Sequence, residues 1–199
     1  MINFEEIELN ALNAVNKNCL PYEEAALHNT RKVIKAFRKH KVSDYYLKPT
    51  TGYAYSDVGR EKLDLIYADI FHAEAALVRS QFVSGTHALA VALLGVLRQG
   101  DEIISATGTP YDTMQTIIGY PVKTPGSLVD IGVSYKEVPM SGSKVAIKEL
   151  QSAVTPKTRM VLIQRSCGYS DARKTLTVAA IGEICQAVKT INPDCLCFV

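Results

Sequence analysis

A short polar run between two apolar segments is the part of this sequence best suited to chemistry. Ser84-Gly85-Thr86-His87 follows a predicted strand at 76–82, and an apolar helix from Ala88 to Leu97 begins at once. Unpaired N–H groups and partial positive charge at a helix start bind anions, and a glycine lets an oxyanion approach the backbone. Because the spaced glycines and the lysine of a nucleotide-triphosphate loop are missing, the pattern favours a single phosphate.

The same pattern also fits a plainer structure, an ordinary strand-to-helix turn capped by a serine or threonine side chain. The four residues therefore carry two interpretations, a phosphate site and a helix cap. Which of the two holds depends on the polar groups that the fold brings beside this turn.

The composition is that of a globular protein without a large charge of either sign. The chain has 199 residues, 47% hydrophobic and 21% charged, with a formal net charge of +2. It can bury the core of one large domain or most of one, and its charge is too small to indicate nucleic acid or an anionic membrane as a partner. No stretch reaches 18 apolar residues, and glutamates at positions 5, 6 and 8 make the N-terminus unlike a secretory signal. We therefore expect a cytoplasmic protein with neither a membrane nor a nucleic-acid partner.

The cysteines and histidines do not form a recognisable metal site. Five cysteines, an odd number, argue against a disulfide framework in such a protein. Cys195 and Cys197 alternate within an apolar run, which favours reduced strand residues over metal ligands. The four histidines show no ligand spacing with them, so no metal is predicted.

The first 72 residues are predicted to be mainly helical. One amphipathic helix is expected to end near Pro21, and a second to run from Tyr22 to His40. A polar, turn-rich stretch at 43–57 and a third helix at 60–72 follow.

Beyond this region the pattern changes to alternating strands and helices. Strands are expected at 76–82, 102–106, 133–138, 159–164 and 195–199. Helices are expected near 86–97, 111–118, 145–153 and 177–190. The alternation predicts an α/β fold built on a mainly parallel sheet with helical crossovers.

Polar clusters follow three of these strands, at 84–87, 107–113 and 164–169. Ligands of such sheets bind beyond the carboxyl ends of the strands, so a phosphate-binding turn, an aromatic ring and a cation are expected around one crevice. Tyr111, at a helix start, suits stacking on a flat heterocycle, and it also fits ordinary packing. Arg165 is either the cation of that crevice or a solvated strand end.

Four segments of the chain resemble one known family. They are Gly-Tyr-Ala-Tyr-Ser-Asp-Val-Gly-Arg at 52–60, Val-Ser-Gly-Thr-His-Ala-Leu-Ala at 83–90, Thr-Gly-Thr-Pro-Tyr-Asp-Thr at 107–113 and Ile-Gln-Arg-Ser-Cys-Gly-Tyr at 163–169. In order and spacing they resemble the methionine gamma-lyase-like proteins, also labelled aluminium-resistance or cystathionine beta-lyase-like proteins. These belong to the fold-type I enzymes that use pyridoxal 5′-phosphate. The resemblance extends over essentially all 199 residues.

The resemblance implies an α/β fold in which N-terminal helices precede the mostly parallel sheet of a fold-type I large domain. Residues 1–58 would form a helical arm, and residues 59–199 part of the cofactor-binding domain, truncated before its last strands. The strand at 76–82 would then lack the later strands that pair with it in the family.

The resemblance also implies roles for residues around the cofactor. Gly85 and Thr86 would bind its phosphate through backbone N–H groups, and Ser84 would support the loop. Tyr111 matches the tyrosine that stacks on the pyridine ring and that takes part in proton transfer in related lyases.

Other matched residues point to a shared active site. Tyr55 and Arg60 match residues that reach the cofactor phosphate of a neighbouring subunit, in a homodimer or homotetramer. Their spacing is wider than the Tyr-x-Arg of the better-known lyases. Arg165 and Ser166 would face the site without an assigned task, and His87 would pack or cap at the helix start.

Two groups that the family's chemistry requires are not found. A pyridoxal 5′-phosphate enzyme needs a Schiff-base lysine and an acidic partner for the pyridine nitrogen. In the family the aspartate directly follows a strand like 195–199, and the lysine comes later. Lys123, Lys144 and Lys174 read as loop or surface residues. The sequence is therefore expected to be the N-terminal half of the enzyme, without its lysine.

Two functions follow from the resemblance. The first is a pyridoxal 5′-phosphate-dependent carbon–sulfur lyase acting on a sulfur amino acid, of the methionine gamma-lyase or cystathionine beta-lyase type. The second is an inactive fragment or pseudoenzyme that serves as a scaffold or as half of a complex. A Rossmann nucleotide binder is disfavoured, since no Gly-x-Gly-x-x-Gly follows the first strand and no acidic residue ends the second. No clustered carboxylates indicate a direct aluminium site.

Overall fold

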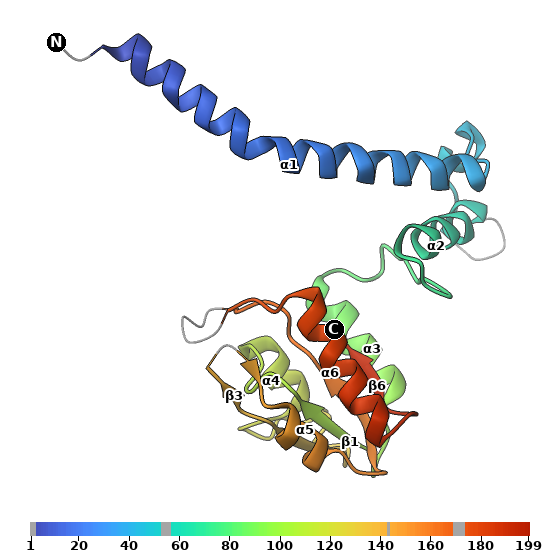
Figure 1. Ribbon diagram of the computed structural model, residues 1–199. Helices are drawn as coiled ribbons and strands as arrows, with labels where there is room; N and C mark the ends of the chain where they lie inside the picture. The colour runs from blue at the N-terminus through green and yellow to red at the C-terminus, as the bar shows by residue number, and fades with distance from the viewer. Residues whose placement is uncertain (1–2, 53–56, 143, 169–173) are drawn as a thin grey trace. The chain divides into compact units, whose positions relative to one another are not determined.

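The computed structural model describes residues 3–52, 57–142, 144–168 and 174–199 (Figure 1). The chain forms two compact units, Met1–Phe82 and Val83–Val199. The two units meet at residues 82 and 83, not at the expected boundary at residue 58. That expected boundary separates a helical arm from a cofactor-binding domain, and it stays a prediction.

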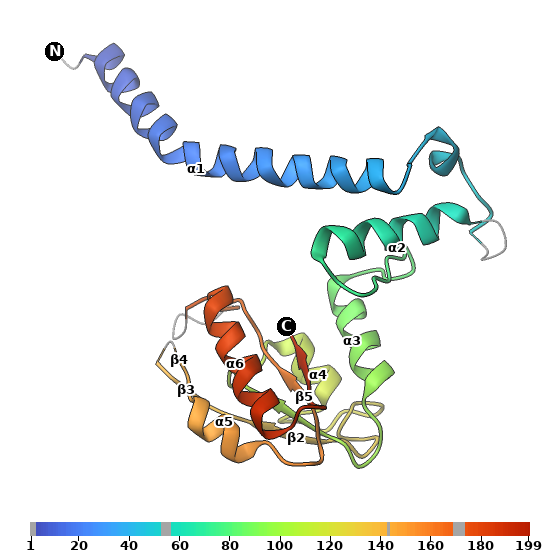
Figure 2. The same cartoon turned by 45° about the vertical axis from the view of Figure 1, so that its right-hand side comes forward.

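The first unit begins with a single long helix, α1 (Phe4–Lys39). Asn3 caps it by accepting a hydrogen bond from the Glu6 N–H at 3.3 Å. The expectation of two helices divided near Pro21 is wrong, because Pro21 lies inside α1. A proline removes one backbone hydrogen bond and crowds the preceding turn, which can kink a long helix without ending it. Figures 1 and 2 show a bend about halfway along α1.

The rest of the first unit contains η1 (Asp44–Leu47) and α2 (Val58–Phe71). The third expected helix is therefore confirmed, two residues earlier than its expected start. Asp57 caps α2 by accepting a hydrogen bond from the Arg60 N–H at 3.2 Å.

Residues 76–82 do not form the expected strand. The Val78 N–H donates to Asp64 Oδ1 at 2.8 Å, and Arg79 Nη1 donates to the same oxygen at 2.6 Å. Hydrogen bonding from Arg79 holds the pKa of Asp64 below its ordinary value. A strand requires a neighbouring strand for its N–H and C=O groups, and the described part of the first unit contains none. A carboxylate of α2 supplies an acceptor instead.

The second unit is a four-stranded parallel sheet with helices packed around it (Figure 2). In sheet order the strands are β2 (Ser134–Glu137), β1 (Glu102–Ser105), β5 (Thr158–Leu162) and β6 (Leu196–Phe198). The helices are α3 (Gly85–Val96), α4 (Asp112–Ile118), α5 (Ile147–Ala153) and α6 (Val178–Ile191). Four of the five expected strands and all four expected helices are confirmed.

A short antiparallel hairpin, β3 (Met140–Ser141) with β4 (Lys144–Val145), is a further element of the second unit. The sequence does not predict it, because strands of two residues are too short to show a periodic pattern.

Successive residues of the central strands point to opposite faces of the sheet, and both faces are buried. Ile104 lies in a cluster with side chains of α5 and α6, whereas its neighbour Ile103 lies in a cluster with side chains of α3 and α4. Val161 and Met160 of β5 divide between the two clusters in the same way. Since helices cover both faces, the ends of the strands are the places where a ligand can reach the sheet.

Glu102 connects three strands at the amino end of the sheet. It is buried, and its carboxylate accepts hydrogen bonds from the hydroxyls of Thr158 at 2.6 Å and Thr155 at 3.2 Å. Lys136 Nζ of β2 lies 2.5 Å from the other carboxylate oxygen. Burial alone would raise the pKa of Glu102, but the hydrogen bonds from Lys136 and Thr158 outweigh it and hold the pKa below its ordinary value.

We expect Glu102→Gln to lower the free energy of unfolding by about 2 kcal/mol at pH 7, because the substitution removes charge-assisted hydrogen bonds. The folded-state pKa of Glu102 lies below the unfolded value, so its contribution is present above the unfolded pKa and lost as the pH falls through the folded pKa. Urea unfolding between pH 7 and pH 3 should show the wild type and the variant converging.

The control is Glu183→Gln on the exposed side of α6, which should match the wild type at every pH. A Glu102→Gln deficit that stays constant down to pH 3 would show that the ionised carboxylate is not what stabilises this end of the sheet.

Among the described residues, no helix has both the length and the hydropathy needed for a membrane span.

Candidate active site

The parallel pairing of β1 with β5 brings two polar segments to the same edge of the sheet. The segments are residues 106–112 after β1 and residues 163–168 after β5. The Gln164 N–H donates to Thr107 Oγ1 at 3.2 Å, and the Tyr111 N–H donates to Gln164 Oε1 at 3.2 Å. Gln164 therefore joins the end of β5 to the turn that carries Tyr111.

Tyr111 stands at the start of α4 in an extended conformation, with φ −67° and ψ 161°. Its side chain is half-buried and packs against the cluster that contains α3 and α4. Pro110, directly before it, is buried, and the Pro110 carbonyl oxygen accepts a hydrogen bond from Gln115 Nε2 at 2.6 Å. The backbone of Tyr111 is thus held by side chains on both sides.

Two cavities meet at Tyr111. We call the first the apolar cavity: it has a volume of about 530 Å³, and Leu89 of α3, Met114 of α4 and Phe198 of β6 are among its lining residues. Arg165 also lines it.

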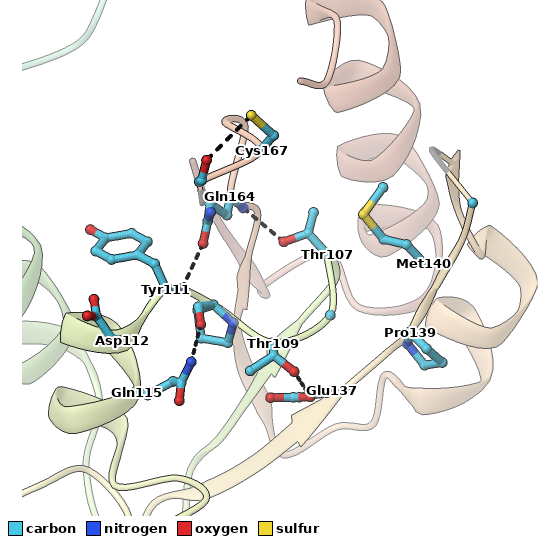
Figure 3. Close-up of a pocket in the computed structure, with 14 residues that line it drawn as sticks. Thr107, Thr109, Tyr111, Asp112, Gln115, Glu137, Pro139, Met140, Gln164 and Cys167 are labelled. Atoms are coloured by element: carbon cyan, nitrogen blue, oxygen red, sulfur yellow. Dashed lines mark hydrogen bonds between the residues drawn. The ribbon is translucent and has the colours of Figure 1, made fainter. Parts of the chain in front are cut away.

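The second, which we call the polar cavity, has a volume of about 910 Å³. Its lining includes Thr107, Glu137, Met140 and Gln164 (Figure 3). Pro110, Tyr111 and Gln164 line both cavities, so the turn after β1 and the segment after β5 form their common wall.

The Ser84–His87 turn starts α3 in the same unit. Ser84 caps the helix by accepting a hydrogen bond from the His87 N–H at 3.1 Å, and His87 Nδ1 accepts one from the Val83 N–H at 3.4 Å. His87 therefore acts within the turn, as expected. Gly85 is exposed, and a Cβ at this position would meet no atom within 4 Å, so its backbone is open to solvent.

The turn itself is not part of either cavity: the described residues 84–87 are absent from both linings, and Leu89, one helical turn further along α3, is the residue of this helix that lines the apolar cavity. α3 packs against α4, which begins directly after Tyr111. The cap and the open backbone are both present, so the two interpretations of the turn are compatible.

Arg60 belongs to the first unit and has local partners. Its Nε lies 3.1 Å from Asp57 Oδ2, and its Nη2 donates to the Gly52 carbonyl oxygen at 2.5 Å. Tyr55 lies outside the described residues. Their expected contact with a neighbouring subunit's phosphate stays a prediction.

Arg165 and Ser166 lie at the rim of the apolar cavity. Arg165 is exposed, and its Nε donates to the Leu176 carbonyl oxygen at 3.3 Å while its own carbonyl oxygen accepts from the Leu176 N–H at 2.9 Å. Arg165 is therefore both an exposed residue after a strand and a lining residue of the apolar cavity.

Sequence reasoning did not single out the polar side chains that position this site. Gln115 and Gln164 hold the turn of Tyr111, and Glu137 accepts hydrogen bonds from Thr109 Oγ1 and the Tyr135 hydroxyl, both at 2.9 Å. Burial, followed by the hydrogen bond to Glu137, raises the pKa of Tyr135. The sequence did contain one indication that Gln164 and Tyr111 lie close together, because the polar segments that carry them both follow predicted strands.

The cysteines take no part in either a disulfide or a metal cluster among the described residues. Cys197 lies on β6 and packs against the core, and burial followed by its neighbour Cys185 raises its pKa to about 12. Such a thiol is protonated near neutral pH and is a poor nucleophile.

Comparison with protein families identifies the family to which this chain belongs. The model for methionine gamma-lyase matches residues 4–199. The chain belongs to the methionine gamma-lyase family. The family expected from the four motif segments is therefore confirmed.

Relatives of this methionine gamma-lyase family member come from several bacteria. The uncharacterized protein YnbB of Bacillus subtilis (strain 168) is 44% identical over 179 residues, 89% of this chain and 42% of that protein. A Listeria monocytogenes crystal structure, provisionally named a cystathionine beta-lyase involved in aluminium resistance, is 41% identical with a TM-score of 0.91 and matches 98% of this chain and 50% of that one. A carbon–sulfur lyase involved in aluminium resistance from Clostridium novyi NT is 36% identical with a TM-score of 0.88, covering 100% of this chain and 48% of that one.

The chain spans about half the length of these methionine gamma-lyase family relatives. The expected fold class, N-terminal helices followed by a mainly parallel α/β sheet, is confirmed by the structure and by these similarities.

We expect Ser84→Ala to destabilise the second unit by about 1 kcal/mol, because the His87 N–H loses its acceptor at the start of α3. Urea unfolding followed by circular dichroism measures the change. Ser84→Thr keeps a hydroxyl at the cap and should retain most of the stability. Equal stabilities for the wild type and Ser84→Ala would mean that the serine does not cap the helix in solution.

Proposed function

We propose that the chain supplies the cofactor-binding part of a pyridoxal 5′-phosphate-dependent carbon–sulfur lyase that acts on a sulfur amino acid. The observation that carries the proposal is the family match over residues 4–199. Support comes from the Clostridium novyi relative, which is named a carbon–sulfur lyase. The geometry of the second unit agrees with this function in part, because the aromatic ring of Tyr111 lines a cavity that Leu89 of α3 also lines.

The residues of the second unit suit pyridoxal 5′-phosphate. Open space lies beside Gly85, and the N–H groups of Gly85 and Thr86, in the first turn of α3, have no acceptor among the described residues. The apolar cavity of about 530 Å³ is in the range of small-molecule sites, and an aromatic ring lines it. We infer that Gly85 and Thr86 hold the phosphate and that Tyr111 covers the pyridine ring.

When bound, pyridoxal 5′-phosphate supplies an electron sink for the carbon from which a proton is removed. The residues of this chain would hold and orient the cofactor. Ser84 holds the turn in place by accepting from the His87 N–H, and the ring of Tyr111 would cover the pyridine ring. The hydroxyl of Tyr111 is the group of this chain that we propose to hold or move a proton during the reaction.

Further residues have to complete the site. No lysine among the described residues lines either cavity. We therefore propose that the Schiff-base lysine belongs to a region equivalent to the half of the relatives that this chain does not cover.

We also propose that the protein assembles with a second copy of itself, so that Tyr55 and Arg60 serve the neighbouring site. The N-terminal half of α1 supports an interface, since a series of its apolar side chains is more than half exposed. The series is Phe4, Ile7, Leu9, Leu12, Val15 and Leu20. Exposed apolar surface of this kind marks protein–protein contacts.

A second candidate function is a scaffold without catalysis. The lack of a lysine among the described residues that line the two cavities favours it. Borohydride separates the two functions. In a protein that includes the region proposed to carry the lysine, reduction attaches the cofactor permanently if the protein is a lyase with that lysine engaged, whereas a scaffold releases the cofactor on unfolding. Mass spectrometry of the reduced, unfolded protein distinguishes these outcomes.

We expect Tyr111→Ala to weaken binding of pyridoxal 5′-phosphate by about two- to tenfold, the range for one aromatic stacking contact. Tyr111→Phe should keep the affinity, because the ring remains, and should reduce turnover by about 10²-fold or more if the hydroxyl moves a proton. Equilibrium dialysis measures the affinity and steady-state kinetics measures the turnover.

Tyr45→Ala in the first unit, where the side chain is 59% exposed, is the matched control for loss of a tyrosine. The proposed cofactor site is wrong if Tyr111→Ala binds pyridoxal 5′-phosphate as tightly as this control.

A further inference from the structure

We propose that Gln115 and Gln164 form a clamp on the peptide group between Pro110 and Tyr111, and that this clamp sets the position of the Tyr111 ring over the cofactor. The inference rests on the proposed function for its purpose, since the ring has to be placed only if it covers a ligand. The two glutamines are positioning residues, because they act through Tyr111.

The clamp consists of two hydrogen bonds to a single peptide group. Gln115 Nε2 donates to the Pro110 carbonyl oxygen at 2.6 Å, and the Tyr111 N–H donates to Gln164 Oε1 at 3.2 Å (Figure 3). The C=O and N–H of a trans peptide point in opposite directions in one plane. Bonds on both therefore resist rotation of that plane, which a bond on one side alone would not.

The orientation of this peptide plane determines where the Tyr111 side chain points. The proline ring fixes φ at Pro110, so rotation of the peptide plane is the main freedom left before the Tyr111 Cα. Tyr111 occupies the cap position of α4, but its side chain makes no capping hydrogen bond. Gln164, from the segment after β5, accepts from the N–H of the cap residue itself, the bond that a glutamate or glutamine at the third helical position makes in a capping box.

Gln164 is itself held in place. Its backbone N–H donates to Thr107 Oγ1 at 3.2 Å, and its Nε2 donates to the Ser166 carbonyl oxygen at 3.3 Å. Thr107 follows β1 and Gln164 follows β5, which are hydrogen-bonded neighbours in the sheet. The position of the Tyr111 ring is thus tied to the register of two strands.

A direct contact of the glutamines with a ligand is the alternative, since both line the polar cavity. The amide of Gln164 already uses its oxygen for Tyr111 and its nitrogen for Ser166, and Gln115 uses its nitrogen for Pro110. These bonds favour the positioning role.

The first test needs no cofactor. In Gln164→Met the Tyr111 N–H loses its acceptor, and we expect its hydrogen exchange to become about fivefold faster, the factor expected for one hydrogen bond. Thr116→Val is the matched control, because it removes a side-chain hydrogen bond to the Asp112 carbonyl oxygen in the same helix. Exchange at Tyr111 that changes no more in Gln164→Met than in Thr116→Val overturns the clamp.

The second test uses pyridoxal 5′-phosphate as the probe and measures circular dichroism in the cofactor's absorption band, normalised to the amount bound. A ring held in one position gives a strong signal, so both Gln164→Met and Gln115→Met should reduce it by about half or more, whereas Thr116→Val should not. The two variants approach the peptide from opposite sides, so either alone suffices if the other fails to fold. An unchanged signal per bound cofactor in both variants contradicts the positioning role.

Gln164→Glu separates the clamp from a general role in the loop. This variant keeps an acceptor for the Tyr111 N–H and loses the donor to Ser166, so exchange at Tyr111 should stay near the wild-type rate. Exchange as fast as in Gln164→Met would overturn the assignment. If the wild type binds no pyridoxal 5′-phosphate, the proposed function fails, while the exchange measurement still decides whether the clamp exists.

Discussion

The parallel pairing of β1 with β5 is the constraint on which the candidate site depends. The register places Ser105 beside Leu162, so the segments that follow these residues leave the sheet at the same edge. Gln164 then bonds to both Thr107 and Tyr111. A shift of one residue between the two strands would turn their side chains to the opposite faces and move Gln164 away from the Tyr111 turn. Stability and site geometry therefore have a common origin in this pairing.

The two ends of the sheet have different tasks. At the amino end Glu102 is buried and bonded to Lys136, Thr158 and Thr155, so all its interactions are internal. At the carboxyl end, polar groups line two open cavities instead. This division is typical of α/β proteins, in which loops after the strands carry function while the opposite end contributes stability.

Much of the second unit could be predicted from sequence, because its signals are local. Apolar runs that alternate with helical patterns located β1, β2, β5 and β6, and the Ser84–His87 turn lies where α3 begins. The meeting of the Tyr111 turn with the Gln164 segment followed from the rule that ligands bind beyond the carboxyl ends of parallel strands. What the rule could not give is the bond between them, since Tyr111 and Gln164 are 53 residues apart and an isolated glutamine has no motif.

The errors have equally specific causes. Pro21 was expected to end a helix, yet the turns on both sides continue and α1 bends instead. Residues 76–82 have the apolar composition of a strand, but strand formation depends on a partner that composition cannot reveal. In both places the outcome is set by what surrounds the segment and not by the residues of the segment itself.

A crystal structure of the protein with pyridoxal 5′-phosphate would test the central claim most directly. We predict that the phosphate lies within hydrogen-bonding distance of the Gly85 and Thr86 N–H groups, with the pyridine ring parallel to Tyr111 and the bonds from Gln115 and Gln164 intact. A cofactor bound elsewhere, or at this turn with its ring away from Tyr111, would contradict it.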